Sequence, residues 1–274
     1  VLIKVYLQHK IDPKKRSALR EFQKESEIAY AEGRIPTILR MRTSLELATS
    51  LAHRRAFEAA EIIAARAAAD AKKLDNIPVL YEATANLVRI NAMLGIASET
   101  GSRVRRAETY HNAHVIADHV AILFPTAKNL DAVDPLAAKA RAYHGIIRAL
   151  MESYDIKSEK EWEFEGLTSV ANLPDLIEWQ DGLTEELCKI DFSGLRVPDF
   201  PIDMERVGWT GAVITGYNIT PEGYVTNKRI LGEVTKELFS HTVFEAMDKW
   251  KMDVDGLDPG CLKNRTFTVL FVFG

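Results

Sequence analysis

The C-terminal part of the chain, residues 198–274, constrains the fold most, because its apolar residues change their period in a fixed order. Residues 212–219 alternate at period two, and Val213, Thr215, Tyr217 and Ile219 share one face. The Thr-Pro-Glu-Gly that follows is typical of a tight turn, because proline presets φ and glycine accepts a positive φ. A second extended run starts at residue 224. The order predicts two strands joined by a turn.

A helix and a last strand complete this segment. Residues 238–250 place apolar side chains on one helical stripe: Leu238, Phe239, Val243, Ala246, Met247 and Trp250. Residues 266–273 then alternate phenylalanines and Val269 with Thr266, Thr268, Leu270 and Val272. We predict a small α+β domain whose last strand closes a three-stranded antiparallel sheet. If that strand is an edge, an extended segment of another chain can pair with it.

The segment resembles the C-terminal domain of the TonB energy-transducer family. The resemblance rests on a proline-aromatic-proline motif, a glycine before the first strand, the strand itself, the turn and three helix positions. These are Pro198-Asp199-Phe200-Pro201, Gly211, Val213, Thr215, Tyr217, Ile219, the turn at residues 220–223, Phe239, Ala246 and Trp250. It covers less than a third of the chain, and it implies a domain that binds a short extended segment of an outer-membrane transporter.

By resemblance, that segment pairs with the last strand while the proline-aromatic-proline motif flanks it. Main-chain hydrogen bonds would supply affinity and side-chain pockets would add selectivity. The expected peptide-binding residues are Pro198, Phe200, Pro201, Thr266, Phe267, Thr268, Val269, Leu270 and Phe271.

The rest of the chain predicts helices and a connector. Residues 1–155 form successive amphipathic helices, some rich in alanine, which fits either a tetratricopeptide-like array or a plain helical bundle. Ala107, Tyr110 and His111 recur 33 positions later as Ala140, Tyr143 and His144. Residues 156–193 are too apolar for a disordered tether, so we expect a packed connector with a short helix near residues 184–190. The TonB-like domain would then span residues 194–274.

Composition excludes several classes of protein. The 274 residues are 47% hydrophobic and 27% charged, which is ordinary for a globular protein. A net charge of −4 gives no basic field for nucleic acid. No run of 18 apolar residues predicts a membrane span.

No catalytic motif or cofactor site is expected. The sequence lacks a phosphate-binding glycine loop, a nucleophile elbow and an HExxH pair. His111, His114 and His119 lie on one predicted helix, and we interpret them as structural rather than as metal ligands. Asp253, Asp255 and the residues after them lack the final glutamate of a calcium loop. We therefore predict a non-enzymatic binding protein without a metal or cofactor.

The two cysteines, Cys188 and Cys261, lack a CxxC or zinc spacing. Cys188 falls on the apolar side of a predicted helix, where a buried thiol is at home. We expect both to be free thiols. Since Val1 is not a start methionine, we also expect that a signal peptide or an N-terminal anchor precedes it.

Two functions follow. The first is a periplasmic TonB-type protein that binds an outer-membrane transporter segment and contributes to energy-coupled transport. Its helical part would contact other envelope proteins. The alternative is an envelope adaptor that uses helical repeats and a TonB-like docking or oligomerisation domain without energy transduction.

Overall fold

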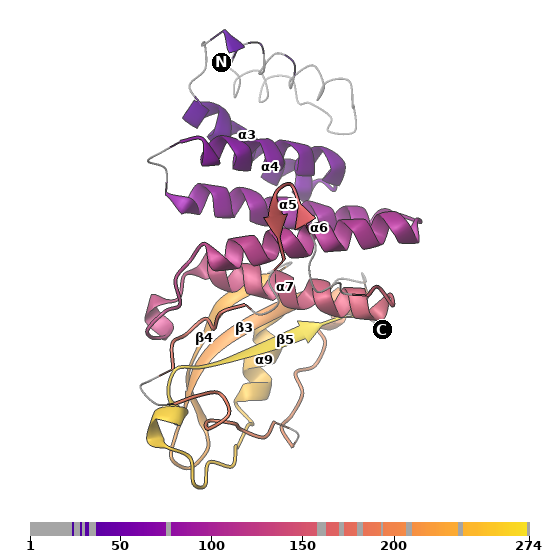
Figure 1. Ribbon diagram of the computed structural model, residues 1–274. Coiled ribbons are helices and arrows are strands. Elements are labelled where there is room, and N and C mark those ends of the chain that lie inside the picture. The colour runs from indigo at the N-terminus through magenta and orange to yellow at the C-terminus, as the bar shows by residue number, and fades with distance from the viewer. Residues whose placement is uncertain are drawn as a thin grey trace. The chain divides into compact units, whose positions relative to one another are not determined.

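The computed structural model describes residues 24, 28, 31–32, 37–74, 78–157, 163–169, 173–179, 183–192, 194–206, 210–234 and 238–272. Helices precede a small three-stranded antiparallel sheet (Figure 1), which confirms the predicted α+β class. Most of the predicted helical region before residue 37 lies outside the described residues, as do Trp209 and Phe273. None of the described helices is long and apolar enough to cross a membrane.

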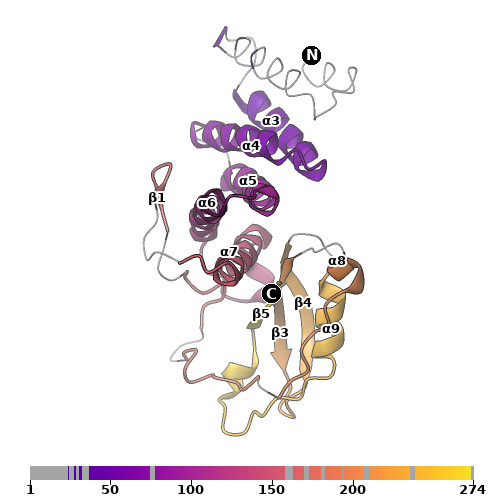
Figure 2. The same ribbon diagram turned by 90° about the vertical axis from the view of Figure 1, so that its right-hand side faces the viewer.

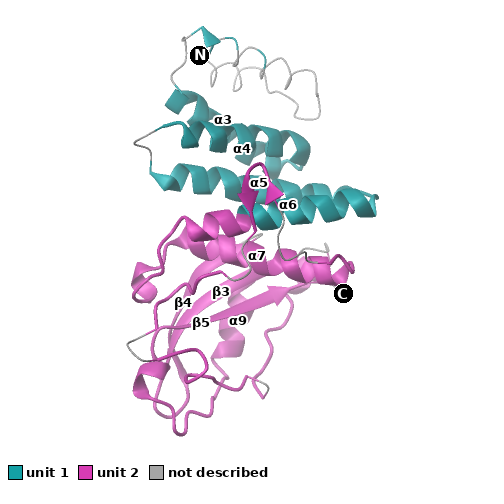
Figure 3. Ribbon diagram, in the orientation of Figure 1, with its two compact units in different colours: residues 1–116 teal, residues 117–274 magenta. Residues whose placement is uncertain are grey.

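The chain divides into two compact units, Val1–Ile116 and Ala117–Gly274 (Figure 3). The division falls inside α6 (Arg103–Ile122), whereas the sequence placed the end of the helical domain near residue 155. The difference arises because α7 (Pro135–Ser153) packs on all three strands of the sheet and so belongs to the second unit.

Unit 1 consists of α3 (Thr37–His53), α4 (Phe57–Lys72), α5 (Val79–Glu99) and the first part of α6. The small side chains of α4 let α3 and α5 approach closely, and Ala60, Ala64 and Ala67 have no exposed surface. The helix α5 continues past Gly95, although glycine often marks the end of a helix. That glycine lies against the ring of Phe57. A Cβ at this position would be only 2.4 Å from a ring carbon, so a larger residue would clash with the ring.

The tight junction between α3 and α4 is a left-handed cap without glycine. Arg55 has φ 61°, Ala56 donates its N–H to the Leu51 carbonyl (2.9 Å) and Arg55 donates to Ala52 (3.0 Å). These two bonds form the Schellman arrangement that ends a helix. At the opposite end of the same helix pair, Arg40 of α3 and Asp70 of α4 form a buried ion pair, with 2.6 Å between Nε and Oδ2.

Unit 2 is built around the sheet β4-β3-β5, formed by β3 (Gly211–Ile219), β4 (Val225–Val234) and β5 (Arg265–Phe271). Figure 2 shows this order from one side. The predicted turn joins β3 to β4, with Gly223 at φ 87° and its N–H bonded to the Thr220 carbonyl (2.9 Å).

The strand β3 is buried on both faces. Val213 and Tyr217 face the core that contains α9 (Ser240–Met247), and Ala212 and Ile214 are equally buried on the other face. The helix α7 covers this second face. Its close approach requires Gly232 of β4, where a Cβ would lie 2.7 Å from the Ala138 carbonyl carbon. A strand that is apolar on both faces needs such a second layer.

The helix α9 is shorter than the predicted 238–250. It begins where Glu233 of β4 accepts hydrogen bonds from the N–H groups of Phe239 (2.6 Å) and Ser240 (3.2 Å). A carboxylate at this position satisfies free N–H groups and complements the helix dipole. Trp250, beyond the end of α9, is still 2% exposed and lies in the same core.

The connector carries a small hairpin, β1 (Glu163–Phe164) and β2 (Leu167–Thr168). The helix predicted near residues 184–190 is wrong. The structure has a single turn there, in which Cys188 donates its N–H to Thr184 (3.0 Å). A disulfide bond at Cys188 holds this turn to the sheet domain.

Candidate functional site

The strand β5 is an edge of the sheet, which meets the condition that the sequence analysis set for pairing with another chain. It pairs regularly with β3 along its whole length, from Gly211 opposite Phe271 to Tyr217 opposite Arg265. Among the described residues, β3 is the only strand that pairs with β5. In a regular antiparallel pair, alternate backbone groups point away from the partner strand. The outer side of β5 therefore presents a row of backbone donors and acceptors.

The opposite edge, β4, is irregular. Its register with β3 shifts between Ile214 and Thr215 and again between Gly216 and Asn218, and Asn227 has φ 51°. Lys228 on this strand donates to the Phe244 carbonyl (3.3 Å) and pairs with Asp248. Bulges and edge lysines are features that discourage strand addition. The two edges thus differ, and β5 is the one suited to pairing.

The side chains of β5 alternate as predicted. Phe267, Val269 and Phe271 point into the core beside α9, while Thr266 and Thr268 are exposed on the other face. Leu270 is 40% exposed. Its side chain also lies against Gly145 of α7, where a Cβ would be 3.1 Å from a Leu270 methyl carbon. The strand is therefore anchored through its side chains.

Part of the proline-aromatic-proline motif lies beside β5. The Phe200 ring meets the Phe271 ring edge to face, with centroids 5.5 Å apart. Pro201 begins α8 (Ile202–Arg206), where its carbonyl accepts hydrogen bonds from Met204 and Glu205 (2.9 and 3.0 Å). Pro198 is half-buried. The structure thus brings Phe200 to the strand, and the prolines shape the chain around it.

A second aromatic contact was not predicted from the sequence. Phe192 stacks on Phe267, with 4.9 Å between centroids, and lies edge to face with Trp250 at 6.1 Å. Trp250 donates its indole N–H to the Arg196 carbonyl (2.7 Å). Phe192 and Phe200 therefore both pack against side chains of β5. In the sequence, this contact was indicated only by the position of Phe192, two residues after Ile190, which also lies in the core.

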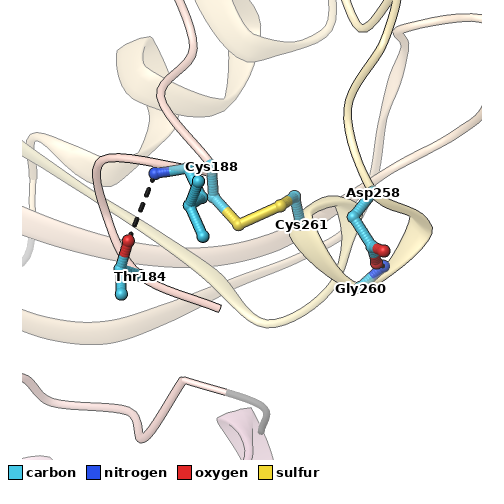
Figure 4. Close-up of a disulfide and its surroundings, with 6 residues drawn as sticks. Thr184, Cys188, Asp258, Gly260 and Cys261 are labelled. Carbon is cyan, nitrogen blue, oxygen red and sulfur yellow. Dashed lines mark hydrogen bonds between the residues drawn. A yellow bond between two sulfur atoms is a disulfide. The ribbon is translucent and has the colours of Figure 1, made fainter. Parts of the chain in front are cut away.

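The expectation of free cysteines is wrong. Cys188 and Cys261 form a disulfide with 5.1 Å between Cα atoms, although 73 residues separate them (Figure 4). Cys261 lies in η2 (Pro259–Leu262), directly before β5, where Asp258 accepts a hydrogen bond from Gly260 (2.7 Å). Both cysteines are buried. Thr184 and Cys188 form the facing turn, so two tight turns bring the sulfur atoms together.

A surface pocket of about 130 Å³ lies at the start of β5. Its lining comes from residues 175–179, Glu185 and residues 260 and 263–266. We call it the Arg265 pocket, because the Arg265 guanidinium is its buried charged group and lies over the Trp179 ring, 5.0 Å from the centroid. The wall is fixed, since Ala127 exchanges backbone hydrogen bonds with residues 176 and 178 (2.9 and 2.7 Å).

The acidic loop at residues 253–258 caps its own backbone. Asp253 accepts a hydrogen bond from the Asp255 N–H (3.1 Å), as Asp258 does from Gly260. Elsewhere in unit 2, His144 of α7 faces the buried Asp118 of α6, with 2.6 Å between Nδ1 and Oδ1. The sequence analysis did not identify this histidine–carboxylate contact.

No protein-family model matches the chain, and no curated protein is significantly similar to it. The TonB resemblance therefore rests on the residues and spacings given above.

Proposed function

We propose that this chain is a TonB-type protein of the periplasm that binds an extended segment of an outer-membrane transporter along β5. The observation that carries the proposal is the contrast between the two edges of the sheet. The β5 edge is regular over its seven residues, whereas the β4 edge is interrupted by register shifts and a positive-φ residue. Strand addition uses backbone hydrogen bonds, so it needs a regular edge with a fixed orientation.

Two further features support this function. Phe192 and Phe200 hold the chain before α8 against the side chains of β5, so the strand keeps its position when its outer edge is occupied. The disulfide suits an oxidising compartment, because disulfides are rare where the cytosol keeps thiols reduced. Contribution to energy-coupled transport follows from the TonB resemblance.

The test is titration of the chain with synthetic peptides that cover the periplasmic N-terminal segments of outer-membrane transporters. Val269→Pro removes a backbone donor from β5, whereas Val269→Ala removes the side chain and keeps that donor. We expect the proline variant to lose peptide binding and the alanine variant to keep it, with circular dichroism confirming that both fold.

Amide hydrogen exchange of the unmutated chain gives a readout that does not depend on the variants. Peptide should slow exchange in β5 and leave the β4 amides unchanged. Binding that protects no β5 amide, or a folded proline variant with unchanged affinity, refutes strand addition at this edge.

The adaptor alternative predicts a different occupant for the same edge. A second copy of the chain could pair through β5, because an open regular edge is a template for self-association as well as for peptide binding. A dimer that the proline variant abolishes, together with no affinity for any transporter peptide, favours oligomerisation without energy transduction.

A further inference from the structure

Two histidines and a buried carboxylate converge on α6 and α7. Asp118 of α6 has no exposed surface, and its Oδ1 lies 2.6 Å from Nδ1 of His144 on α7. His114 precedes Asp118 by four residues on the same continuous helix, a spacing that places both side chains on one helix face. One ligand atom from each of the three lies within 4.8 Å of the other two. In the part of the chain that the structure describes, no other three histidine, cysteine or acidic side chains converge in this way.

These residue types are common ligands of zinc and similar divalent ions. Imidazole nitrogens and carboxylate oxygens bind Zn²⁺ at about 2.0–2.2 Å, so the ligand atoms of a tetrahedral site lie about 3.4 Å apart. The 2.6 Å contact between Asp118 and His144 is shorter than this spacing, and the 4.8 Å limit of the set is longer. Small side-chain rotations therefore suffice to bring the three around one ion. Three protein ligands leave one tetrahedral position for water.

A simple hydrogen-bonded pair explains less of this arrangement. One imidazole is enough to bond a buried carboxylate, yet a second imidazole, that of His114, converges on the same carboxylate from the preceding turn of α6. A divalent ion supplies the positive charge that a carboxylate without exposed surface requires. The side chain of His144 is 17% exposed, which leaves the ion an approach from solvent.

We propose that His114, Asp118 and His144 bind a divalent transition-metal ion of the zinc type. The ion joins α6 to α7, the helix that packs on all three strands of the sheet. This site is independent of strand addition at β5. It also changes the role of His114, which the sequence analysis interpreted as structural. The third ligand, His144, lies 26 residues beyond Asp118, so only the folded chain shows the complete set.

The experiment is calorimetric titration of the full chain with zinc, after chelator treatment and dialysis without reductant. We expect one zinc ion per chain, since the two cysteines are bonded to each other and offer no competing thiolate. His144→Gln should weaken binding at least about 100-fold, because losing even an outer hydrogen-bond partner of a ligand costs about 10–100-fold. His119→Gln removes an imidazole of α6 that lies outside the cluster, so this control should keep the affinity.

A second measurement requires no variant to fold. The imidazole nitrogen resonances of the unmutated chain are followed while zinc is added. We expect those of His114 and His144 to shift together and to saturate at one equivalent, while the exposed His241 stays unchanged. Zinc should also raise the melting temperature, as a ligand that binds the folded state does.

Three results would overturn the metal site. These are no zinc binding, zinc binding that a folded His144→Gln variant leaves unchanged, and resonance shifts confined to exposed histidines such as His241. The last two would show adventitious binding at the surface only. If His144→Gln does not fold, the resonances of the unmutated chain decide between the two outcomes.

Discussion

The bond between Cys188 and Cys261 makes a quantitative prediction for the stability of unit 2. It closes a loop across 73 residues, and in the chain-entropy description a loop of this length stabilises the folded state by about 4 kcal/mol. The loop includes the connector turn, the chain before α8, β3, β4 and α9, so the restraint acts on most of the sheet domain. Removing it should therefore lower the free energy of unfolding of that domain rather than of α3–α5.

The assay is urea unfolding followed by circular dichroism, with and without a thiol reductant. With an m-value of about 2 kcal/mol/M, a loss of 4 kcal/mol moves the midpoint by roughly 2 M. Reduction changes no other atom, and the double variant Cys188→Ala, Cys261→Ala serves as the matched comparison. Two reactive thiols per denatured, unreduced chain, or a loss below about 1 kcal/mol on reduction, would refute the reasoning.

Three further changes test the packing of the same domain. Trp250→Ala should cost about 3–5 kcal/mol in urea unfolding, since the ring is buried and its N–H is bonded, and a loss below about 1 kcal/mol would contradict that packing. Gly232→Val should lower the melting temperature sharply, because its side chain would meet the α7 backbone; Gly101→Val, in open space, is the control and should leave it nearly unchanged. Burial raises the pKa of Tyr217 to about 12, although Arg265 lowers it in part. Unfolded tyrosine titrates near 10, so Tyr217 should lower the free energy of unfolding by up to about 1.4 kcal/mol per pH unit between pH 10 and 12. Tyr217→Phe should remove this share, while the buried Tyr143, whose pKa burial also raises, contributes a fall that remains.

Local periodicity was enough to predict the three strands of the sheet domain and the position of its longest helix. The alternation around Val269 and the turn at Gly223 are local patterns, and backbone geometry fixes which face each side chain takes. The elements α3–α7 followed from the helical repeat in the same way. Helix ends are harder to predict from local patterns. Glycine ends many helices, but Gly95 remains inside α5, where Phe57 packs against it.

Contacts between distant segments could not be predicted in this way. The alternation in β3 shows apolar residues on both faces, yet nothing local says that α7, far back in the sequence, covers the second one. The disulfide fails for the same reason. Cys188 looked like a helical core residue, and only the tertiary arrangement of two turns places it beside Cys261. Likewise, the sequence gives no sign that Arg265 is buried.

The proposed peptide site depends on a property that side-chain identity does not encode. Strand addition recognises backbone groups, so the features that distinguish β5 from β4 are regular register and the absence of bulges among the described residues, rather than particular residue types. A sequence motif can therefore change while the edge remains usable. If strand addition at β5 is correct, substitutions on its exposed face, such as Thr268→Ser, should therefore change affinity little.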